Sequence, residues 1–322
     1  MKTRLLLGAI GAMGTLFTAS VTHASDYPDR PIKVLVGYSA GGSGDTIARI
    51  VTAAMAEKLG QSIVVENKPG AGSTIASTTI AAAPKDGYTL GLATGNIYGV
   101  DQFAYDVSYT PEDFTPINRL ASYPLILAVN AEKGPKTFKE FLEKAKANPD
   151  SMFYSSSGVA GSPHTSAVML QDYMDTSFTH VPYKGGKPAL LAVAAGDVDF
   201  SMGTAPSVLP LGRGDKVRML AVSTAERSPV APDLPTIAES GVTDFDYSFW
   251  FGLFGPAGLP TDVAEKLTNT VSEVLADPAV QQKLLASGSV AGAFESAAAF
   301  NEFARDNGAF TLERVKRAKS AN

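Results

Sequence analysis

The residues of this chain that could most directly do chemistry form the segment Gly37-Tyr38-Ser39-Ala40-Gly41. Its Gly-x-Ser-x-Gly pattern is that of a nucleophile elbow, a tight strand-to-helix turn that exposes a serine hydroxyl. The segment follows an apolar run at 32–36 and continues through Gly42-Ser43-Gly44-Asp45 into a helical pattern. Such a loop also points the unbonded N–H groups of a helix start at one spot, where an anion is favoured. The sequence therefore predicts either a reacting serine or a site that holds an anion.

A serine hydrolase also needs an acid and a histidine base, which in this motif follow the serine in that order. Beyond the N-terminal segment the chain has only His164 and His180, and neither is near the C-terminus. The elbow pattern also comes before any sheet could have formed to present it. We therefore expect no catalytic residue, and a secreted serine esterase using Ser39 stays as the enzymatic alternative. His164, at a helix start, is expected to support a ligand loop, and His180 is expected to be structural.

Four loops rich in glycine and hydroxyl residues each follow a predicted strand. They span residues 39–45, 94–96, 155–162 and 183–186. In α/β proteins the loops at the carboxyl ends of the strands form the ligand site. Hydroxyls and backbone N–H groups can hold a carboxylate without a charged partner. Together the loops favour a binding site for a small anion.

Three features near these loops have two interpretations each. Asp45 either complements the start of its helix or contacts the ligand. Asp199 either faces the cleft or is buried with partners. The aromatic run Phe249-Trp250-Phe251, which holds the only tryptophan, either packs in the core or hinge or forms a wall of the cleft.

Composition and motifs exclude several other classes of site. The chain has no cysteine and no paired histidines at ligand spacing, so we expect no metal. It has neither a phosphate-binding Gly-x4-Gly-Lys loop nor a Gly-x-Gly-x-x-Gly fingerprint, so we expect no nucleotide cofactor. The formal net charge is −5, and the one basic run, 314–319, fits a solvated helix end. Nucleic acid is therefore not an expected partner.

The N-terminus has the features of a secretory signal. Lys2 and Arg4 precede an apolar stretch at 5–19, and Thr22-His23-Ala24 offers small residues for cleavage. We predict a signal peptide at 1–24 and a periplasmic protein; an uncleaved N-terminal anchor is the alternative. The absence of cysteine excludes a lipoprotein and a disulfide framework.

Strand and helix patterns alternate over most of the chain, which favours α/β sheets. The alternation ends after a strand at 217–223, where helices at 261–276, 279–287 and from about 296 follow an aromatic strand at 247–251. Because this tail lacks strands of its own, we expect it to pack on the first α/β unit. The predicted first domain is 25–123 plus 226–322, the second is 124–225, and the chain crosses the hinge twice.

Several segments resemble the Bug-type periplasmic solute-binding receptors of tripartite tricarboxylate transporters, over essentially the whole mature chain. These segments are 27–32 (YPDRPI), 40–49 (AGGSGDTIAR), 65–73 (VENKPGAGS), 84–90 (PKDGYTL), 181–185 (VPYKG), 232–241 (PDLPTIAESG) and 250–258 (WFGLFGPAG). One departure is Gly37-Tyr38-Ser39, where the family usually has a Phe-Pro or Pro-Phe-Pro sequence. We expect this segment to give the protein a ligand preference different from that of the usual family member.

The resemblance implies two α/β domains of the type II-like Venus flytrap class that close on a small mono-, di- or tricarboxylate, with no catalysis. It implies a monomer that delivers its ligand to inner-membrane permease subunits; a sensory protein that presents its closed form to a signalling partner is the alternative. In the family, the loops matching Ala40-Gly41-Gly42 and Thr94-Gly95 hold one carboxylate, and the loop matching 156–162 and the acid matching Asp199 shape the other side. The predicted ligand-binding residues are Tyr38, Ser39, Ala40, Gly41, Gly42, Asp45, Thr94, Gly95, Asn96, Ser156, Ser157, Gly158, Ser162, His164, Lys184 and Asp199.

Overall fold

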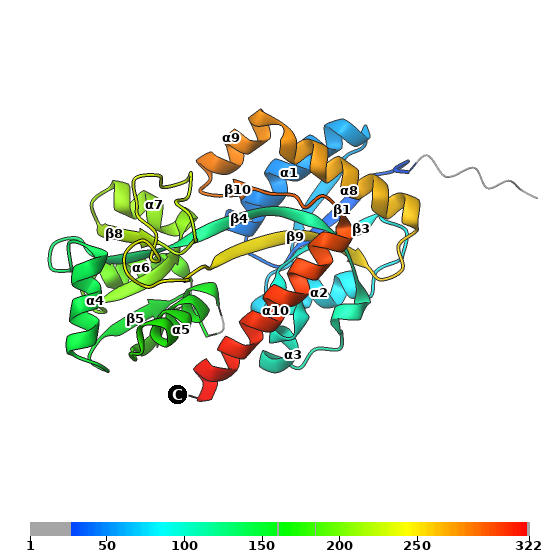
Figure 1. Cartoon of the computed structure of the whole chain (residues 1–322). Helices are drawn as coiled ribbons and strands as arrows, with labels where there is room; N and C mark the ends of the chain where they lie inside the picture. Colours follow the sequence, from blue (N-terminus) through cyan, green and yellow to red (C-terminus); the bar gives the residue numbers. More distant parts are fainter. Residues whose placement is uncertain (1–26, 160, 184, 321–322) are drawn as a thin grey trace, which may run out of the picture.

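Two α/β lobes joined by two long strands make up the protein (Figure 1). The structure, a computed structural model, describes residues 27–159, 161–183 and 185–320, the last three as backbone only. The predicted signal peptide at 1–24 lies outside the described residues. The strands that connect the lobes are β4 (Phe114–Asn130) and β9 (Ser248–Pro256).

The first lobe has a mixed sheet between two layers of helices (Figure 1). Its strands run in the order β2 (Ile63–Asn67), β1 (Ile32–Val36), β3 (Thr89–Ala93), β9 and β4, and β10 (Val290–Ala291) pairs with β4. One layer contains α1 (Ser43–Leu59), α8 (Thr261–Ala276) and α9 (Pro278–Ala286). The other contains α2 (Thr74–Ala81), α3 (Val100–Ala104) and α10 (Ala297–Ser320), with short 3-10 turns at Ala71–Ser73, Gly95–Tyr98 and Pro111–Asp113.

Helix α1 shows how the sequence specifies this lobe. Ile47, Val51 and Met55 recur at four-residue spacing and are fully buried against the sheet, as the 3.6-residue period requires. The helix ends at Gly60, whose φ of 66° is open to glycine at little cost. The apolar spacing over 45–59 and the glycine at position 60 predict this helix, and its end at Leu59 is confirmed.

The second lobe has its own helices around the other half of the sheet. Its strands run β4, β7 (Phe200–Thr204), β5 (Phe153–Ser156) and β6 (Thr179–Pro182), and β8 (Val217–Val222) also pairs with β4. Its helices are α4 (Phe138–Ala147), α5 (Ser162–Met174), α6 (Gly186–Ala195) and α7 (Ala205–Arg213). Strands β5, β6 and β7 are parallel, so the loops after them meet at one edge.

Strand β4 belongs to both lobes. Its residues from Phe114 to Pro124 pair with β9, and those from Leu125 to Asn130 pair with β7 and β8. The apolar run in the sequence predicts a strand only over 125–129. The first half was missed because Pro116 and Asn118 interrupt the apolar pattern, and β4 is irregular there, with register shifts against β9.

The segment between β8 and β9 packs on the second lobe. Ile237 N–H donates to Val222 O, and Tyr247 N–H donates to Ser223 O, both at 2.8–2.9 Å. Phe245 is fully buried in the second lobe's core. The predicted domain boundary at 225/226 assigned this stretch to the first domain, whereas its contacts extend the second lobe to β9.

Helix α10 contacts both lobes. Its first half packs on the first lobe, where Phe300 is fully buried beside Trp250. Its last turns reach α5, and the Arg317 guanidinium lies 3.3 Å from the Asp172 carboxylate. The tail packs on the first lobe, as expected, and α10 in addition reaches the second lobe. In the described part of the chain no helix is long and apolar enough to cross a membrane.

Candidate functional site

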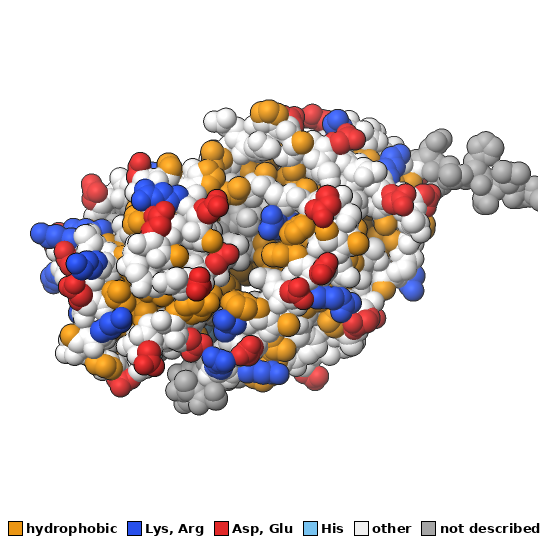
Figure 2. All heavy atoms as spheres, viewed as in Figure 1, with side chains coloured by type: hydrophobic (Ala, Val, Ile, Leu, Met, Phe, Trp, Pro, Cys, Tyr) orange, Lys and Arg blue, Asp and Glu red, His pale blue; other side chains and the backbone are white. Residues whose placement is uncertain are grey.

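A cavity of about 690 Å³ lies between the lobes, where loops of both converge. Hydrophobic side chains gather along part of the seam between the lobes on the face shown in Figure 2. The residues of the first lobe and the connecting strands that line the cavity are Tyr38, Ser39, Gly42, Ser43, Gly44, Gly72, Asn96, Val100, Tyr105, Tyr123, Phe249 and Phe251. From the second lobe it is lined by Ser157, Gly158, Val159, Gly161, Ser162, Pro163, Gly185, Gly186, Ala189, Ser201, Gly203, Thr204 and Ser207.

Four helices begin at this cavity. Its lining includes residues of the first turn of α1, α5, α6 and α7, so four positive helix ends face the same space. Of the described residues that line it, none has a charged side chain. An anion here would be held by hydroxyls, N–H groups and helix dipoles rather than by a salt bridge.

The loop between β1 and α1 is held by its own carboxylate. Gly41, at a φ of 77°, donates its N–H to Asp45 Oδ2 at 2.9 Å, and Gly42 N–H donates to Ser39 O at 3.1 Å. Asp45 is buried and also accepts hydrogen bonds from Arg49 and Asn67. Burial raises the pKa of Asp45, but these three hydrogen bonds outweigh it and hold the pKa below its usual value.

Tyr38 presents its ring to the cavity. The ring packs edge-to-face on Phe251 with centroids 5.2 Å apart. Burial raises the pKa of the Tyr38 phenol to about 12, although hydrogen bonds with the side chains of Ser73 and Thr94 lower it in part. The Tyr38 hydroxyl therefore lies near the side chains of Ser73 and Thr94.

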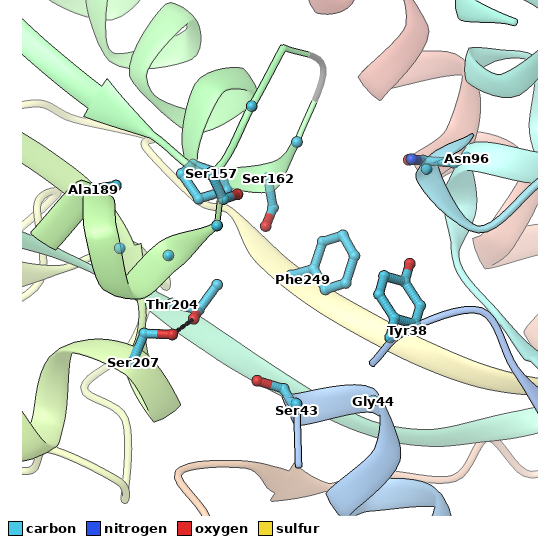
Figure 3. Close-up of a pocket in the computed structure, with 18 of the residues that line it drawn as sticks. Tyr38, Ser43, Gly44, Asn96, Ser157, Ser162, Ala189, Thr204, Ser207 and Phe249 are labelled. Atoms are coloured by element: carbon cyan, nitrogen blue, oxygen red, sulfur yellow. Dashed lines mark hydrogen bonds between the residues drawn. The ribbon is translucent and has the colours of Figure 1, made fainter. Parts of the chain in front are cut away.

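On the second lobe, the loop after β5 contains one serine whose hydroxyl bonds within the protein and two serines that line the cavity. Ser156 is fully buried, accepts from Gly158 N at 3.1 Å and lies 2.7 Å from His180 Nε2. Ser157 and Ser162 line the cavity, and no hydrogen bond within the described residues engages their hydroxyls (Figure 3). Gly158 has a φ of 131°, which a side chain would strain.

The predicted residues divide into two groups. Tyr38, Ser39, Gly42, Asn96, Ser157, Gly158 and Ser162 line the cavity. Ala40, Gly41, Asp45, Thr94, Gly95, Ser156 and His164 do not, and lie in or behind the loops that do. Lys184 lies outside the described residues.

Three of the supporting residues are buried for identifiable reasons. Thr94 accepts from Asn96 N at 3.3 Å, which caps the turn that carries Asn96. Gly95 packs against Trp250 and Asn307, which leaves little room for a side chain. His164 stacks on His180 inside the second lobe. The placement of Thr94 and Gly95 corrects the expectation that they face the ligand directly, whereas His164 lies behind the cavity loops, where a supporting residue was expected.

Asp199 lies away from the cavity. It directly precedes β7, whose other end supplies the cavity residues Gly203 and Thr204. Its carboxylate lies 2.7 Å from Lys144 Nζ and accepts from Phe153 N at 2.9 Å. The expectation that Asp199 shapes the ligand side of the cleft is corrected: it pairs with Lys144 at the opposite end of the strand.

The aromatic run in β9 serves both of its alternative roles. Side chains alternate across a strand, so Phe249 and Phe251 reach the cavity while Trp250 faces the other side. Trp250 is 2% exposed and donates its indole N–H to Asn307 Oδ1 at 2.8 Å.

Sequence reasoning missed Gly203, Thr204 and Ser207, which line the cavity after β7. Thr204 Oγ1 and Ser207 Oγ lie 3.0 Å apart (Figure 3). The sequence contains the same pattern here as in the other four loops, because a glycine and hydroxyl residues follow an alternating apolar pattern at 198–202. The helix α7 was missed because Pro206 and Pro210 interrupt its pattern.

The site has no arrangement for metal or acyl-transfer chemistry among the described residues. No group of three metal-ligating side chains occurs in the described part of the chain. Ser39 is exposed on the first lobe, whereas His164 and His180 stack within the second. His180 Nε2 is already bonded to Ser156 Oγ.

Comparison with known proteins places this geometry among binding proteins. Residues 47–318 match the family described as the tripartite tricarboxylate transporter family receptor. The UPF0065 protein of the tcbD-tcbE intergenic region of Pseudomonas sp. strain P51 is 35% identical over 287 residues, 88% of this chain and 84% of the relative. BugT of Bordetella pertussis is 30% identical over 296 residues, 89% of this chain and 90% of that protein.

Two solved structures with named ligands share the fold. Rpa4515 of R. palustris with adipate has a TM-score of 0.82 and 31% identity, over 91% of this chain and 99% of that one. MatC of Rhodopseudomonas palustris with bound malate has a TM-score of 0.76 and 31% identity, over 90% of this chain and 100% of that one. Both ligands are small carboxylates.

Proposed function

Because this chain belongs to the receptor family of tripartite tricarboxylate transporters, a family of periplasmic solute-binding proteins, we propose that it captures a small carboxylate between its lobes. In this proposal the receptor is exported to the periplasm, acts as a monomer and delivers its ligand to the permease subunits in the inner membrane. The residues that hold the ligand are those of the loops and helix starts at the cavity.

One observation carries the proposal. Four helix starts surround a cavity whose described lining has hydroxyls and N–H groups but no charged side chain. Each helix end contributes about 0.3–1 kcal/mol toward an anion, and more where it is partly buried. The overall charge of −5 opposes this little, because salt screens long-range repulsion over about 8–10 Å.

Binding is expected to close the lobes on the ligand. Strands β4 and β9 connect the lobes directly, and rotation about them would bring the α1 loop toward the starts of α5 and α6. The ligand would favour the closed state because it contacts both lobes only there.

A thermal-shift panel tests the proposal. Carboxylates of four to six carbons, citrate, amino acids and aromatic acids are each added to purified protein that has been unfolded and refolded to remove bound ligand. A ligand at about 100 times its Kd should raise the free energy of unfolding by about 2.7 kcal/mol. If no carboxylate raises the Tm, the proposal fails.

The delivery step has its own test. Solubilised membranes that contain the permease of a tripartite transporter are passed over the immobilised receptor, with and without ligand. Ligand-dependent capture of the permease supports delivery. Capture of a signalling protein alone would instead support the sensory alternative.

A further inference from the structure

The two walls of the cavity differ in chemistry. On the side of the first lobe lies a connected set of rings, the aromatic wall, formed by Tyr38, Tyr123, Phe249 and Phe251. Phe249 packs edge-to-face on Phe251 with centroids 5.3 Å apart, and Tyr123 lies 5.4 Å from Phe249. Tyr123 and Phe251 are buried, so the half-buried Tyr38 and Phe249 offer the accessible ring surface.

Some of the polar groups close to the aromatic wall already have partners within the protein. The Tyr38 phenol lies near the side chains of Ser73 and Thr94, and the Tyr123 phenol lies near the side chain of Ser43. The N–H groups of Gly41 and Gly42 are used inside the β1–α1 loop.

The helix starts differ as well. In α1 the first turn already contains a carboxylate, Asp45, which complements that dipole from within. The first turns of α5, α6 and α7 contain no acidic residue. The second lobe also supplies the hydroxyls of Ser157 and Ser162, which have no hydrogen-bond partner among the described residues (Figure 3). A ligand carboxylate is therefore better satisfied at the second lobe than at the first.

We infer that the ligand is an aromatic monocarboxylate, whose carboxylate lies at the starts of α5 and α6 beside Ser157 and Ser162 and whose ring packs on Tyr38 and Phe249. This inference rests on the proposed function, since it names the class of carboxylate that the same cavity takes. Aromatic rings attract one another edge-to-face and offset, a geometry that an aliphatic chain cannot reproduce. The Asn96 amide, at the edge of the aromatic wall, is placed to bond with a polar ring substituent (Figure 3).

Calorimetric titration with matched probes separates ring from charge. Benzoate and 3-phenylpropionate carry both features, cyclohexanecarboxylate keeps the charge with a puckered ring, benzamide keeps the ring without the charge, and adipate replaces the ring by a second carboxylate. We expect at least one aromatic acid to bind about tenfold or more tightly than cyclohexanecarboxylate and adipate, and benzamide not to bind. Adipate binding more tightly than every aromatic acid would overturn the inference.

Variants locate the ring. Phe249→Ala should weaken the aromatic acids about tenfold and change adipate less than about twofold, because only the ring contact is lost. Phe249→Leu keeps an apolar side chain for folding and should still weaken them several-fold. Phe153→Ala, at an exposed ring on β5 outside the cavity, is the matched control and should change neither class. Equal losses for both classes in Phe249→Leu would contradict the ring contact.

The outcomes also separate this inference from the proposed function. If adipate or malate binds and no aromatic acid does, the receptor function stands and the aromatic assignment is wrong. If no carboxylate of either kind binds, both fail.

Discussion

The imidazole rings of His164 and His180 stack with their centroids 4.0 Å apart and their planes 11° from parallel. The Tyr154 ring packs on both, with its centroid 4.9 Å from that of His180 and 6.2 Å from that of His164. Ser156 Oγ, at the start of a cavity loop, lies 2.7 Å from His180 Nε2. Two stacked imidazoles tolerate charge poorly. Through the contact of His180 with Ser156, the pair supports the loop that carries Ser157.

This pair predicts acid sensitivity. Burial and then the neighbouring His180 lower the pKa of His164 from 6.5 to about 4, and burial lowers that of His180. The unfolded chain therefore binds more protons between these values, so the free energy of unfolding falls as pH drops from about 6.5 toward 4. Thermal melts should show this loss in the wild type and a smaller one in His164→Gln. An equal loss of Tm between pH 6.5 and pH 4 in the wild type and in His164→Gln would contradict the prediction.

Asp101 should give the opposite dependence. It is fully buried beside Val100, accepts from the Tyr109 hydroxyl at 2.6 Å, and its Oδ1 has no partner among the described residues. Burial raises its pKa from 3.8 to about 6, although the Tyr109 bond lowers it in part. Its contribution to stability is complete below pH 3.8 and is lost as pH rises through about 6. Asp101→Asn should gain Tm relative to the wild type at pH 8 but not at pH 4; an equal difference at both would refute this.

Asp45 should matter through the loop it holds. Asp45→Ala removes the acceptor of the Gly41 N–H and leaves buried donors unpaired, at a cost of about 1–3 kcal/mol in urea unfolding. Ligand affinity should fall along with stability, because the loop carries Ser39 and Gly42. The control is Arg49→Ala, which removes the exposed ion-pair partner of Asp45 and should lower the free energy of unfolding by less than about 1 kcal/mol. A larger effect from Arg49→Ala would mean that the ion pair, not the Gly41 bond, holds the loop.

Ser162 should contribute directly to carboxylate binding. Ser162→Ala removes one hydroxyl from the cavity and should weaken the ligand about 5- to 10-fold in calorimetry, with little change in Tm. Ser151→Ala, at an exposed serine beyond α4, is the matched control. Unchanged affinity in Ser162→Ala would move the carboxylate away from the start of α5.

Ser39 should not react with a fluorophosphonate probe. Both described histidines are stacked in the second lobe, so neither is placed as its base. Labelling is read by mass spectrometry of the intact protein. A covalent adduct that Ser39→Ala abolishes would revive the esterase alternative.

The sequence predicted regular elements well where hydrophobic periodicity was unbroken. The helix at 261–276 was predicted with the bounds that α8 has. A threonine before an apolar helical pattern predicts an N-cap, and Thr137 caps α4 by accepting a hydrogen bond from Glu140 N. The family indicated by the seven matching segments is confirmed. Local patterns of this kind depend only on neighbouring residues.

What the sequence could not give depends on distant partners. The sequence alone suggests that Asp199 could face the cleft, because its ion-pair partner Lys144 lies on α4, far away in the chain. Likewise, Phe249 and Trp250 are adjacent in sequence, and only the strand's orientation decides which of them reaches the cavity. Strand β4 needed knowledge of two different pairing partners.

The position of β9 determines the order in which the lobes can form. It lies between β3 and β4 in the sheet, yet it follows the whole second lobe in the chain. The second lobe, largely continuous from Leu125 to Tyr247, can complete its sheet from nearby segments. The sheet of the first lobe is complete only when β9, which is far along the chain, pairs with β3 and β4. Such non-local pairing is slow. In refolding, we therefore expect the half that contains Ser157 and Ser162 to assemble first and to act as a template for the other.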